Sequence, residues 1–452
     1  MNRCIIKTWT MLLMCLVYAG AARANAVQEK ERPAINGTFI QDYLVKDWND
    51  EKWLKEIQAL KEAGMQYIVF CTAAFTKGEA PYKTLYPTSI PGLSHAYSRD
   101  LLDDCLRNAE KTGIKVFIGI NFNEQWWGRY PEEWLYRQME TGNEVADEIL
   151  QRYKKKYRHA LYGWYWIWEV DNLNYVTPGK QEMLAKALDI NVRHLHKISP
   201  RMPVMLCPFM NYRVGAANEY VKMWEYVFKH VSFKPGDIFA PQDGIGAGGL
   251  TLEVLGNWYK QLAAAVKTKP GLLFWSDAET FDYVGWTAAP IGRFVTQMKI
   301  VQPYVSGIIS FAYSHYYSPV SADPGYHEAY LHYLKTGTVL KQTVPPVSGL
   351  EVKWIDTTKA SISWNAPDSL RQVCGYYIYR DGKLLRNLQG KKNIPPSTIF
   401  TDEGITKHRI YTYEVASYDY YGNIAVKATR VLVDETIGKV PLQQYRQAEI
   451  IK

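Results

Sequence analysis

Apolar and polar positions follow a repeating order between about residues 35 and 335 of this chain. Short apolar runs have the length of buried strands, and the longer segments between them have the three-to-four-residue spacing of amphipathic helices. This order predicts βαβ units around a parallel sheet, and eight strands is the number that closes a (β/α)8 TIM barrel. We therefore expect an α/β barrel over residues 33–340, with strands at Ile35–Tyr43, Tyr67–Phe75, Lys115–Asn123, Leu161–Asp171, Pro203–Phe209, Ile238–Gly246, Leu272–Phe281 and Gly307–His315.

Capping residues mark where the intervening helices begin and end. Asn49 or Asp50 is expected to cap one helix that ends at Gly64, because short polar side chains favour the N-cap and glycine favours the left-handed C-terminal position. The next helix is predicted between Ser98 and Gly113. The other helices are expected to begin near Pro131, Thr177, Ala216, Thr251, Ala289 and Asp323.

A different pattern begins after Val344-Pro345-Pro346, where short strands and turns replace the strand–helix order. The dipeptide Asp381-Gly382 predicts a hairpin turn, because both residues tolerate positive φ. This spacing predicts an all-β immunoglobulin-like or fibronectin type III sandwich over residues 344–436, followed by a C-terminal tail over residues 437–452. Its strands are expected at Leu350–Trp354, Lys359–Trp364, Gly375–Arg380, Tyr411–Asp419 and Val426–Val433.

Four segments of this region resemble fibronectin type III domains: Pro346–Val352, Ile362-Ser363-Trp364, Tyr376–Gly382 and Tyr413–Asp419. The resemblance implies that Trp364 is the core tryptophan of the sandwich. It also implies that either Tyr411 or Tyr413 is the tyrosine whose hydroxyl bonds back to the backbone.

The N-terminus has the composition of a signal peptide. Arg3 and Lys7 precede the apolar stretch Thr10–Ala22, and Ala22-Arg23-Ala24 fits a small-x-small cleavage site. We expect residues 1–24 to be removed and the mature protein to be secreted or periplasmic. A lipoprotein anchor at Cys15 is disfavoured, because Met14 stands where a small residue is expected, and no other segment has the length of a transmembrane span.

Composition narrows the classes of partner. The net charge of +8 belongs partly to the leader, and no dense Lys/Arg stripe indicates nucleic acid. Aromatic residues make up 14% of the chain, with 15 Trp and 34 Tyr, and such rings stack well on sugar rings. We expect a carbohydrate partner and a monomer without a transmembrane segment.

Cysteine and histidine spacings do not indicate a disulfide framework or a metal site. Cys71, Cys105, Cys207 and Cys374 remain after the leader, and none forms a CxxC pair. His194 and His196 lie two residues apart on a predicted helix and therefore face different directions. We expect no metal and no cofactor.

Side chains at the carboxyl ends of barrel strands point into the bowl where chemistry takes place. Polar and aromatic residues concentrate at that end of the predicted strands, and far fewer occur at the other end. The candidate site residues are Asp42, Asn121, Asn123, Glu124, Trp126, Trp127, Glu169, Asp171, Asn172, Asn211, Tyr212, Gln242, Asp243, Trp275, Asp277, Glu279, Tyr313 and His315.

Two of these carboxyl groups suit the cleavage of a glycosidic bond, which needs one acid and one nucleophile or base. Glu169 and Glu279 end the fourth and seventh strands and are expected to face each other across the barrel mouth. Asp171 shares strand parity with Glu169, and Asp277 shares it with Glu279, so each is an alternative. Further carboxylate candidates are Glu124 and Asp243, and candidate stacking platforms are Trp126, Trp127, Trp166, Trp275 and Tyr313.

The segments Trp166-Ile167-Trp168-Glu169 and Asp277–Phe281 carry a resemblance to known families. The barrel resembles the clan A superfamily of retaining glycoside hydrolases, and also a family of secreted bacterial glycosidase-like proteins labelled only as a domain of unknown function. The resemblance implies that Glu169 is the acid/base and Glu279 the nucleophile. The chain departs from the superfamily at Trp168, because many of those enzymes have an asparagine there that binds the sugar 2-hydroxyl.

The glycine-rich segment Gly244–Gly249 follows a predicted strand and precedes a helix. It lacks the Lys-Ser/Thr of a phosphate-binding P-loop and the spacing of a dinucleotide fingerprint. The interpretation is a tight strand-to-helix loop, or a backbone that approaches a sugar closely.

The leading hypothesis is a secreted glycoside hydrolase that acts with retention on oligo- or polysaccharides. Carboxyl groups about 5 Å apart would give retention, and about 7–9 Å would give inversion. The alternatives are a non-catalytic glycan-binding protein on a glycosidase-like barrel, and a structural module of a surface complex with the sandwich as docking domain.

Overall fold

The computed structural model describes residues 32–368, 373–407 and 409–433. The predicted signal peptide, residues 1–24, and the predicted tail, residues 437–452, lie outside these residues. The described chain forms two compact units. One contains the residues up to Asp282 together with Gly292–Val339, and the other contains Tyr283–Ile291 together with the residues from Leu340.

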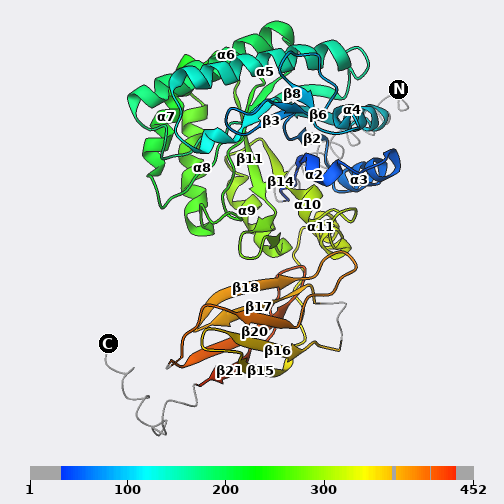
Figure 1. Cartoon of the computed structure of the whole chain (residues 1–452), viewed down its shortest axis with the longest axis vertical. Coiled ribbons are helices and arrows are strands. Elements are labelled where there is room, and N and C mark those ends of the chain that lie inside the picture. The colour runs from blue at the N-terminus through cyan, green and yellow to red at the C-terminus, as the bar shows by residue number, and fades with distance from the viewer. Residues whose placement is uncertain (1–31, 369–372, 408, 434–452) are drawn as a thin grey trace, which may run out of the picture. The chain divides into compact units, whose positions relative to one another are not determined.

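Eight parallel strands close into a barrel in the first unit (Figure 1), which confirms the predicted TIM barrel. Around the barrel the order is β1, β14, β11, β10, β9, β8, β6 and β2, so β14 closes on β1. Parallel strands covered on both faces need apolar side chains at nearly every position, which is why apolar runs locate all eight. They are β1 (Gly37–Ile40), β2 (Tyr67–Phe70), β6 (Lys115–Gly119), β8 (Leu161–Trp166), β9 (Val204–Leu206), β10 (Ile238–Phe239), β11 (Leu273–Glu279) and β14 (Gly307–Phe311).

Each barrel strand ends earlier than its apolar run predicts. The chain leaves β2 at Phe70, and Thr72 takes a positive φ of 50° before β3 (Ala74–Thr76) begins. After β1 and β14 it turns into the short helices α2 (Asp42–Val45) and α10 (Tyr313–Tyr316). The predictions overran because many residues beyond the strand ends remain buried under loops, so apolar character continues after the ladder hydrogen bonds stop.

A small sheet that the periodicity did not predict lies beyond the ends of β2 and β6. Its order is β5-β4-β3-β7, and β3 pairs in parallel with β7. Each of its strands has only two or three residues, which is too short for an alternation pattern to be visible. The remaining three are β4 (Lys83–Thr84), β5 (Ser94–His95) and β7 (Asn121–Asn123), and β7 leads into the 3-10 helix η1 (Glu124–Trp127).

Large side chains fill the inside of the barrel. The rings of Phe39 and Tyr165 meet edge-on at 5.3 Å, and Tyr67 lies 5.6 Å from Trp275. A filled barrel is a packed core and not a pore, so chemistry is confined to its carboxyl-terminal end. The buried cluster is Phe39, Val69, Phe117, Tyr165, Met205, Cys207, Ile238, Ala240, Trp275, Ile309 and Ala312.

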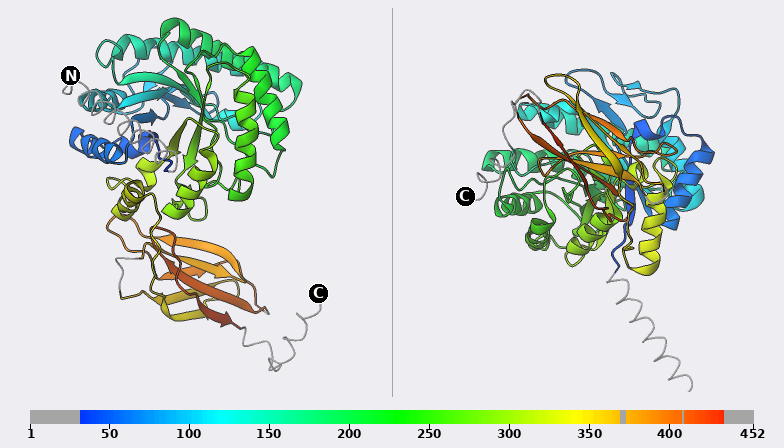
Figure 2. Two further views of the ribbon diagram at one scale, coloured as in Figure 1. Left: turned by 180° about the vertical axis from the view of Figure 1, so that it is seen from behind. Right: turned by 90° about the horizontal axis from the view of Figure 1, so that it is seen from below.

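Helices surround the barrel (Figures 1 and 2). The predicted cap of the first long helix is confirmed, because Asn49 accepts a hydrogen bond from the Lys52 backbone N–H at 2.9 Å. The prediction that the next helix begins at Ser98 is wrong, because Asp100 caps it by accepting from the Asp103 N–H at 2.8 Å. The helices are α3 (Asp50–Glu62), α4 (Leu101–Thr112), α5 (Glu132–Tyr153), α6 (Pro178–Ile198), α7 (Ala217–His230), α8 (Leu252–Val266), α9 (Ile291–Val301) and α11 (Pro324–Thr336).

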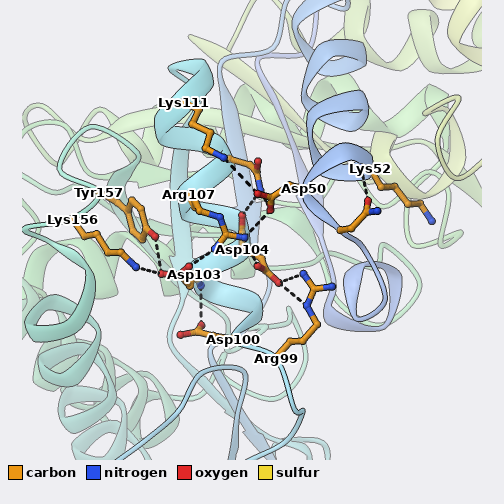
Figure 3. A network of polar contacts seen from close by, with 12 residues as sticks. Asp50, Lys52, Arg99, Asp100, Asp103, Asp104, Arg107, Lys111, Lys156 and Tyr157 are labelled. Carbon is orange, nitrogen blue, oxygen red and sulfur yellow. Dashed lines mark hydrogen bonds and ion pairs between the residues drawn. The ribbon is translucent and has the colours of Figure 1, made fainter.

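An ionic network joins α3 to α4 (Figure 3). Arg107 on α4 donates to Asp50 on α3 at 2.7 Å and to Asp104 at 2.6 Å, and it also pairs with Asp103. Arg99 makes a second ion pair with Asp104 at 2.7 Å. One guanidinium therefore holds three carboxylates, which ties two helices of the outer layer together.

The C-terminal unit contains two antiparallel sheets, ordered β15-β16-β19 and β18-β17-β20-β21. Side chains of both sheets form one buried cluster, which includes Trp364 and Tyr376. The hairpin at Asp381-Gly382 is confirmed, since these residues have φ of 52° and 74°. The strands are β15 (Ser348–Trp354), β16 (Ala360–Asn365), β17 (Gly375–Arg380), β18 (Lys383–Gln389), β19 (Ile399–Asp402), β20 (Tyr411–Tyr418) and β21 (Ala428–Leu432).

Alternation misses β18 and β19 because most of their residues are at least partly exposed. Tyr411 is the tyrosine that bonds to the backbone, because its hydroxyl accepts from the Thr406 N–H at 2.9 Å. The segment 283–291, which the sequence assigns to the barrel, groups with this unit, and Asn387 donates to Thr287 at 2.8 Å. This segment contains β13 (Thr287–Ala288), and β12 (Phe281–Asp282) precedes it. The fibronectin type III identity of the unit stays a prediction.

Two further features concern the described residues alone. Cys71, Cys105, Cys207 and Cys374 are all free thiols. No helix in the described part of the chain is both long enough and apolar enough to span a bilayer.

Candidate active site

Glu169 lies just beyond the carboxyl end of β8 and is partly buried. Its Oε1 accepts a hydrogen bond from Gln242 Nε2 at 3.1 Å, and the same Gln242 nitrogen donates to the Cys207 carbonyl at 3.2 Å. Burial raises the pKa of Glu169 to about 7, the Gln242 hydrogen bond opposes this rise, and the nearby charge of Glu279 adds to it. Gln242 therefore positions a carboxyl group that can hold a proton at neutral pH.

Glu279 ends β11 and is 2% exposed. The backbone N–H of Ala247 donates to its Oε2 at 2.7 Å. A Cβ placed on Gly246 would lie 3.0 Å from the Glu279 Cβ and 2.3 Å from the Phe281 carbonyl oxygen, so only glycine lets the loop pass this closely. The glycine-rich segment 244–249 therefore packs on the carboxylate of Glu279, as a tight loop directed at a carboxylate and not at a phosphate.

Side chains behind Glu279 fix its backbone. Gln297 donates to the Glu279 carbonyl at 3.0 Å and to Asp243 Oδ2 at 2.7 Å. Arg293 donates to the same carbonyl at 3.0 Å and to the Phe281 carbonyl. Asp243 in turn accepts from the Glu279 N–H at 3.3 Å and is completely buried. Asp243 is thus a support for Glu279, not a group open to substrate.

Asp277 lies one strand repeat below Glu279 and is 1% exposed. Its Oδ1 has no hydrogen-bond partner among the described residues. Burial raises its pKa well above the usual range, and the charges of Glu279, Asp243 and Glu169 raise it further. The thiols of Cys71 and Cys207 lie close enough for Asp277 to raise their pKa values, although burial is the larger cause.

Four carboxyl groups therefore share one buried region, namely Glu169, Asp243, Asp277 and Glu279. Like charges this close in a poorly solvated site do not all ionise at neutral pH. Burial also raises the pKa of Glu279 to about 7, while the Ala247 N–H, the Arg293 charge and the Gly246 backbone favour its ionised form. The region can thus hold both a protonated carboxylic acid and a carboxylate.

A polar cluster occupies another part of the rim. Tyr97 donates to Asp42 Oδ2 at 2.6 Å, and Tyr43 Oη lies 3.1 Å from His315 Nδ1. His315 Nε2 lies 3.4 Å from the Gln41 N. Burial lowers the pKa of His315 to about 4, so this imidazole is neutral at pH 7. Tyr43 is 59% exposed and was not among the predicted site residues.

Trp126 and Trp127 have opposite environments although they are adjacent. Trp126 is 4% exposed, and its ring is stacked near Tyr130 and Tyr175 at 5.8 and 5.2 Å. Trp126 Nε1 also donates to the Glu169 carbonyl at 2.8 Å, so this residue supports the end of β8. Trp127 is 55% exposed and is the one of the pair with a ring face available to a sugar.

Other aromatic candidates are part of the core. Trp275 belongs to the barrel interior, and Trp166 is 1% exposed with its Nε1 donating to Asn191 at 3.1 Å. Tyr313 is fully buried, and its hydroxyl contacts His327. Trp168, which stands in the place of the expected asparagine, is 2% exposed and packs 5.5 Å from Trp126. None of these four rings is open to a sugar.

Several polar candidates organise loops. Asn121 donates to the Gln138 carbonyl at 2.9 Å, and Asn123 accepts from the Gln125 N–H at 3.0 Å. Asn172 and Asn211 exchange two hydrogen bonds of 2.9 Å. Contacts of this kind within the protein occupy polar atoms that a substrate would need. These residues therefore shape the loops around the mouth.

Asp171 and Glu124, two further candidates for a catalytic carboxyl group, both have partners within the protein. Asp171 is 7% exposed and accepts from the N–H groups of Leu173 and Asn174 at 2.8 and 2.6 Å. Glu124 is exposed and pairs with Lys77 at 3.4 Å. Tyr212 is 38% exposed, with the Arg213 guanidinium 4.7 Å from its ring centre. Of these three residues, Tyr212 is the one whose exposed ring could contact a sugar.

The sequence did not identify Arg293 and Gln297 as supports of the site. Gln297 is completely buried on α9 between the apolar residues Phe294 and Met298. An amide on an otherwise apolar helix face is the signal that could have found it, because buried polar groups need partners. Arg293 precedes it by one helical turn. No cluster of His, Cys, Asp and Glu suited to a metal ion occurs in the described ranges.

Comparison with known proteins identifies the family of this barrel and a solved structure of similar fold. A family model described as a domain of unknown function, DUF4434, matches residues 35–323. The structure of a putative alpha-L-fucosidase from Bacteroides thetaiotaomicron matches with a TM-score of 0.53 at 21% identity, over 68% of this chain and 91% of that one. At this identity the likeness is one of fold, and it agrees with the predicted barrel.

Curated relatives match only short stretches. Exoglucanase B of Cellulomonas fimi is 30% identical over 121 residues, which is 25% of this chain and 10% of that protein. Chitinase Chi52 of Paenibacillus xylanexedens is 31% identical over 103 residues, which is 22% of this chain and 18% of that protein. The chain thus spans less than a fifth of these relatives.

Proposed function

The chain belongs to the DUF4434 family of domains of unknown function, and we propose that it is a glycoside hydrolase acting through Glu169 and Glu279. One observation carries the proposal. Carboxyl groups from β8 and β11, three strands apart around a closed barrel, lie near enough for the charge of Glu279 to raise the pKa of Glu169. Cleavage of a glycosidic bond needs such a pair, with one member protonated and the other ionised.

Glu169 is the proposed acid/base. Its pKa of about 7 keeps a large protonated fraction at neutral pH, so it can give a proton to the leaving glycosidic oxygen. Once that oxygen has left, the resulting carboxylate accepts a proton from the attacking water. The hydrogen bond from Gln242 holds Oε1 in place through both steps.

Glu279 is the proposed nucleophile. The Ala247 N–H and the charge of Arg293 stabilise its carboxylate, which attacks the anomeric carbon as the bond to the leaving oxygen breaks. A covalent glycosyl-enzyme forms, and water then cleaves it with net retention. Asp243 and Gln297 hold the backbone of Glu279, so the carboxylate does not need to reorganise between the two steps.

The proposal extends to the rest of the chain. The leader-like residues 1–24 place the enzyme outside the cytoplasm, in the medium or periplasm. Residues 344–436 form a fibronectin type III-like module that accompanies the barrel. The substrate is an oligo- or polysaccharide, and exposed Trp127 and Tyr212 contact its sugar rings.

A second candidate function is glycan binding without hydrolysis. The observation that favours it is the coverage of Glu279, which is 2% exposed with one oxygen bound by a backbone N–H. A carboxylate held in this way could also act only as a brace for the glycine-rich loop.

Turnover of a panel of oligosaccharides by the wild type, Glu279→Gln and Glu169→Gln separates the two functions. The hydrolase proposal expects release of reducing ends by the wild type and a loss of about three orders of magnitude in each variant. Background release by all three proteins would overturn it. Glycan-array binding that survives both substitutions would then establish the binding function.

A further inference from the structure

A pocket of about 450 Å³, lined in part by Trp126, lies beside the candidate site. It is bounded by the loop after β7 and by the segment from Asp171 to the first turn of α6. Pockets of this volume hold small-molecule ligands. Trp126 lines the pocket and also donates to the Glu169 carbonyl at 2.8 Å, so the pocket adjoins the proposed acid/base.

Aromatic and hydroxyl groups suit this pocket to a sugar. Trp127, which is 55% exposed, lines the pocket together with Tyr130 and Tyr175. The two phenol oxygens lie 2.5 Å apart, so each retains capacity for a further hydrogen bond. Ring faces beside a few fixed polar groups are the usual chemistry of carbohydrate recognition.

Positive charge distinguishes this pocket from a neutral sugar site. Arg129 and Lys180 both line it, and neither forms an ion pair with any described residue. Lys180 lies in the first turn of α6, where a cation is disfavoured by the positive end of the helix and where no acidic residue compensates. Arg129, in the loop before α5, and Lys180, at the start of α6, together raise the local positive potential.

Asp171 is the one acidic residue of the pocket lining, and its charge is already compensated. Oδ1 accepts from two backbone N–H groups, and Oδ2 accepts from Asn174 Nδ2 at 2.6 Å. Asp171 therefore organises its own loop and leaves Arg129 and Lys180 without a partner.

We propose that this pocket is a subsite for an anionic sugar residue, whose carboxylate or sulfate group pairs with Arg129 and Lys180. The inference rests on the proposed function and narrows its substrate class to acidic glycans. Trp127 stacks on the ring of the bound residue, and the negative group points toward the start of α6. A neutral sugar of the same shape lacks the ionic contact and binds more weakly.

Calorimetry on the full chain tests the charge preference. The probes are trigalacturonate and a hyaluronan tetrasaccharide, each as free acid and as methyl ester, and a κ-carrageenan tetrasaccharide with and without sulfate. Glu279→Gln is used beside the wild type so that turnover does not distort the heats. At least one anionic probe is expected to bind about 10-fold more tightly than its neutral counterpart, with an affinity that falls as salt rises. If an acid binds more tightly than its methyl ester, the pocket binds a carboxylate. If the sulfated tetrasaccharide binds more tightly than the unsulfated one, the pocket binds a sulfate.

Two double variants make the test specific. In Arg129→Gln/Lys180→Gln the preference is expected to fall to within about 2-fold, since the ionic contact is gone. In Lys154→Gln/Lys155→Gln, which removes the same charge from exposed residues at the end of α5, the preference is expected to persist. Melting temperatures confirm that both variants fold.

Three results would each overturn the proposal: equal affinity for every acid and its neutral counterpart, no binding of any anionic probe, or a preference that survives Arg129→Gln/Lys180→Gln. If one of these three results is obtained and the wild type still hydrolyses neutral oligosaccharides, the subsite proposal is wrong and the hydrolase function remains. An anion preference without hydrolysis of any probe by the wild type would instead retain the subsite and remove the hydrolase function.

Discussion

Ala247 donates its backbone N–H to Oε2 of Glu279 at 2.7 Å, so the loop after the sixth barrel strand holds the carboxylate at the end of the seventh. The contact depends on Gly246, which brings the loop backbone against Glu279 and Phe281. A backbone N–H directed at a carboxylate favours its ionised form. The glycine-rich segment thereby becomes part of the proposed catalytic apparatus.

Gly246→Ala is expected to lower kcat by at least about 10-fold, because a Cβ at this position would lie 2.3 Å from the Phe281 carbonyl oxygen and 3.0 Å from the Glu279 Cβ. Displacement of the loop removes the Ala247 hydrogen bond and shifts the nucleophile. Steady-state kinetics and circular dichroism together check this expectation.

Gly179→Ala is the matched control, since a Cβ there would have no atom within 4 Å. Full activity in both alanine variants would show that the loop does not position Glu279.

The pH profile reports the protonation of Glu169. Its pKa of about 7 predicts that kcat/KM falls as the pH rises through about 7, because the acid loses the proton it must donate. Gln242→Leu removes a hydrogen bond that lowers this pKa, so the falling limb is expected at higher pH in that variant. If the falling limb does not move in Gln242→Leu, the group that titrates there is not Glu169.

The two adjacent tryptophans are expected to respond differently to truncation. Trp127→Ala removes an exposed ring, so KM should rise by about 2- to 10-fold, equivalent to about 0.5–1.5 kcal/mol, with the melting temperature unchanged. Trp126→Ala removes a buried ring that is stacked near Tyr130 and Tyr175 and should lower the free energy of unfolding by about 3–5 kcal/mol. Denaturant unfolding and kinetics on both variants distinguish these roles, and the reverse pattern would exchange them.

Arg107→Gln is expected to destabilise the fold by about 1–2 kcal/mol at pH 6, since partly exposed ion pairs contribute modestly and three carboxylates lose one partner. Hydrogen bonds from Arg107 and Asn108 hold the pKa of Asp50 below its ordinary value. A lowered folded-state pKa stabilises the protein above the unfolded pKa, and this contribution is lost as the pH falls.

The stability difference between the wild type and Arg107→Gln should therefore be constant above about pH 5 and shrink as the pH falls below about 4 in urea titrations. Lys55→Gln is the control, because its pair with Glu51 is mostly exposed and should contribute little to stability at any pH. A difference that stays constant with pH would contradict the ionic origin of the effect.

The barrel was predictable because its strands are buried on both faces and leave continuous apolar runs. The strand ends were not, because burial continues past them: Thr72 breaks β2 with a positive φ, and Asp42 begins a helix beside an apolar run. Periodicity reports burial, whereas the end of a strand is set by the backbone hydrogen bonds of its neighbours.

For the candidate site, the sequence predicted which residues lie at the carboxyl ends of the strands. The alternation of side chains along the strands placed Glu169 and Glu279 at the barrel mouth. It could not show that Trp126 is buried while Trp127 is exposed, because Trp126 is covered by Tyr175 from a distant segment. Nor could it show that Gln297, on the helix after the seventh strand, holds Asp243. These relationships join residues far apart in sequence, and a single chain carries no local signal of them.

Chemical rescue of Glu279→Ala tests the central claim most directly, on any oligosaccharide or aryl glycoside that the wild type hydrolyses. The variant is expected to be inactive, and sodium azide should restore turnover with a glycosyl azide of inverted anomeric configuration, because azide takes the place of the carboxylate nucleophile. Wild-type activity in the variant without azide would contradict the assignment of Glu279 as the nucleophile.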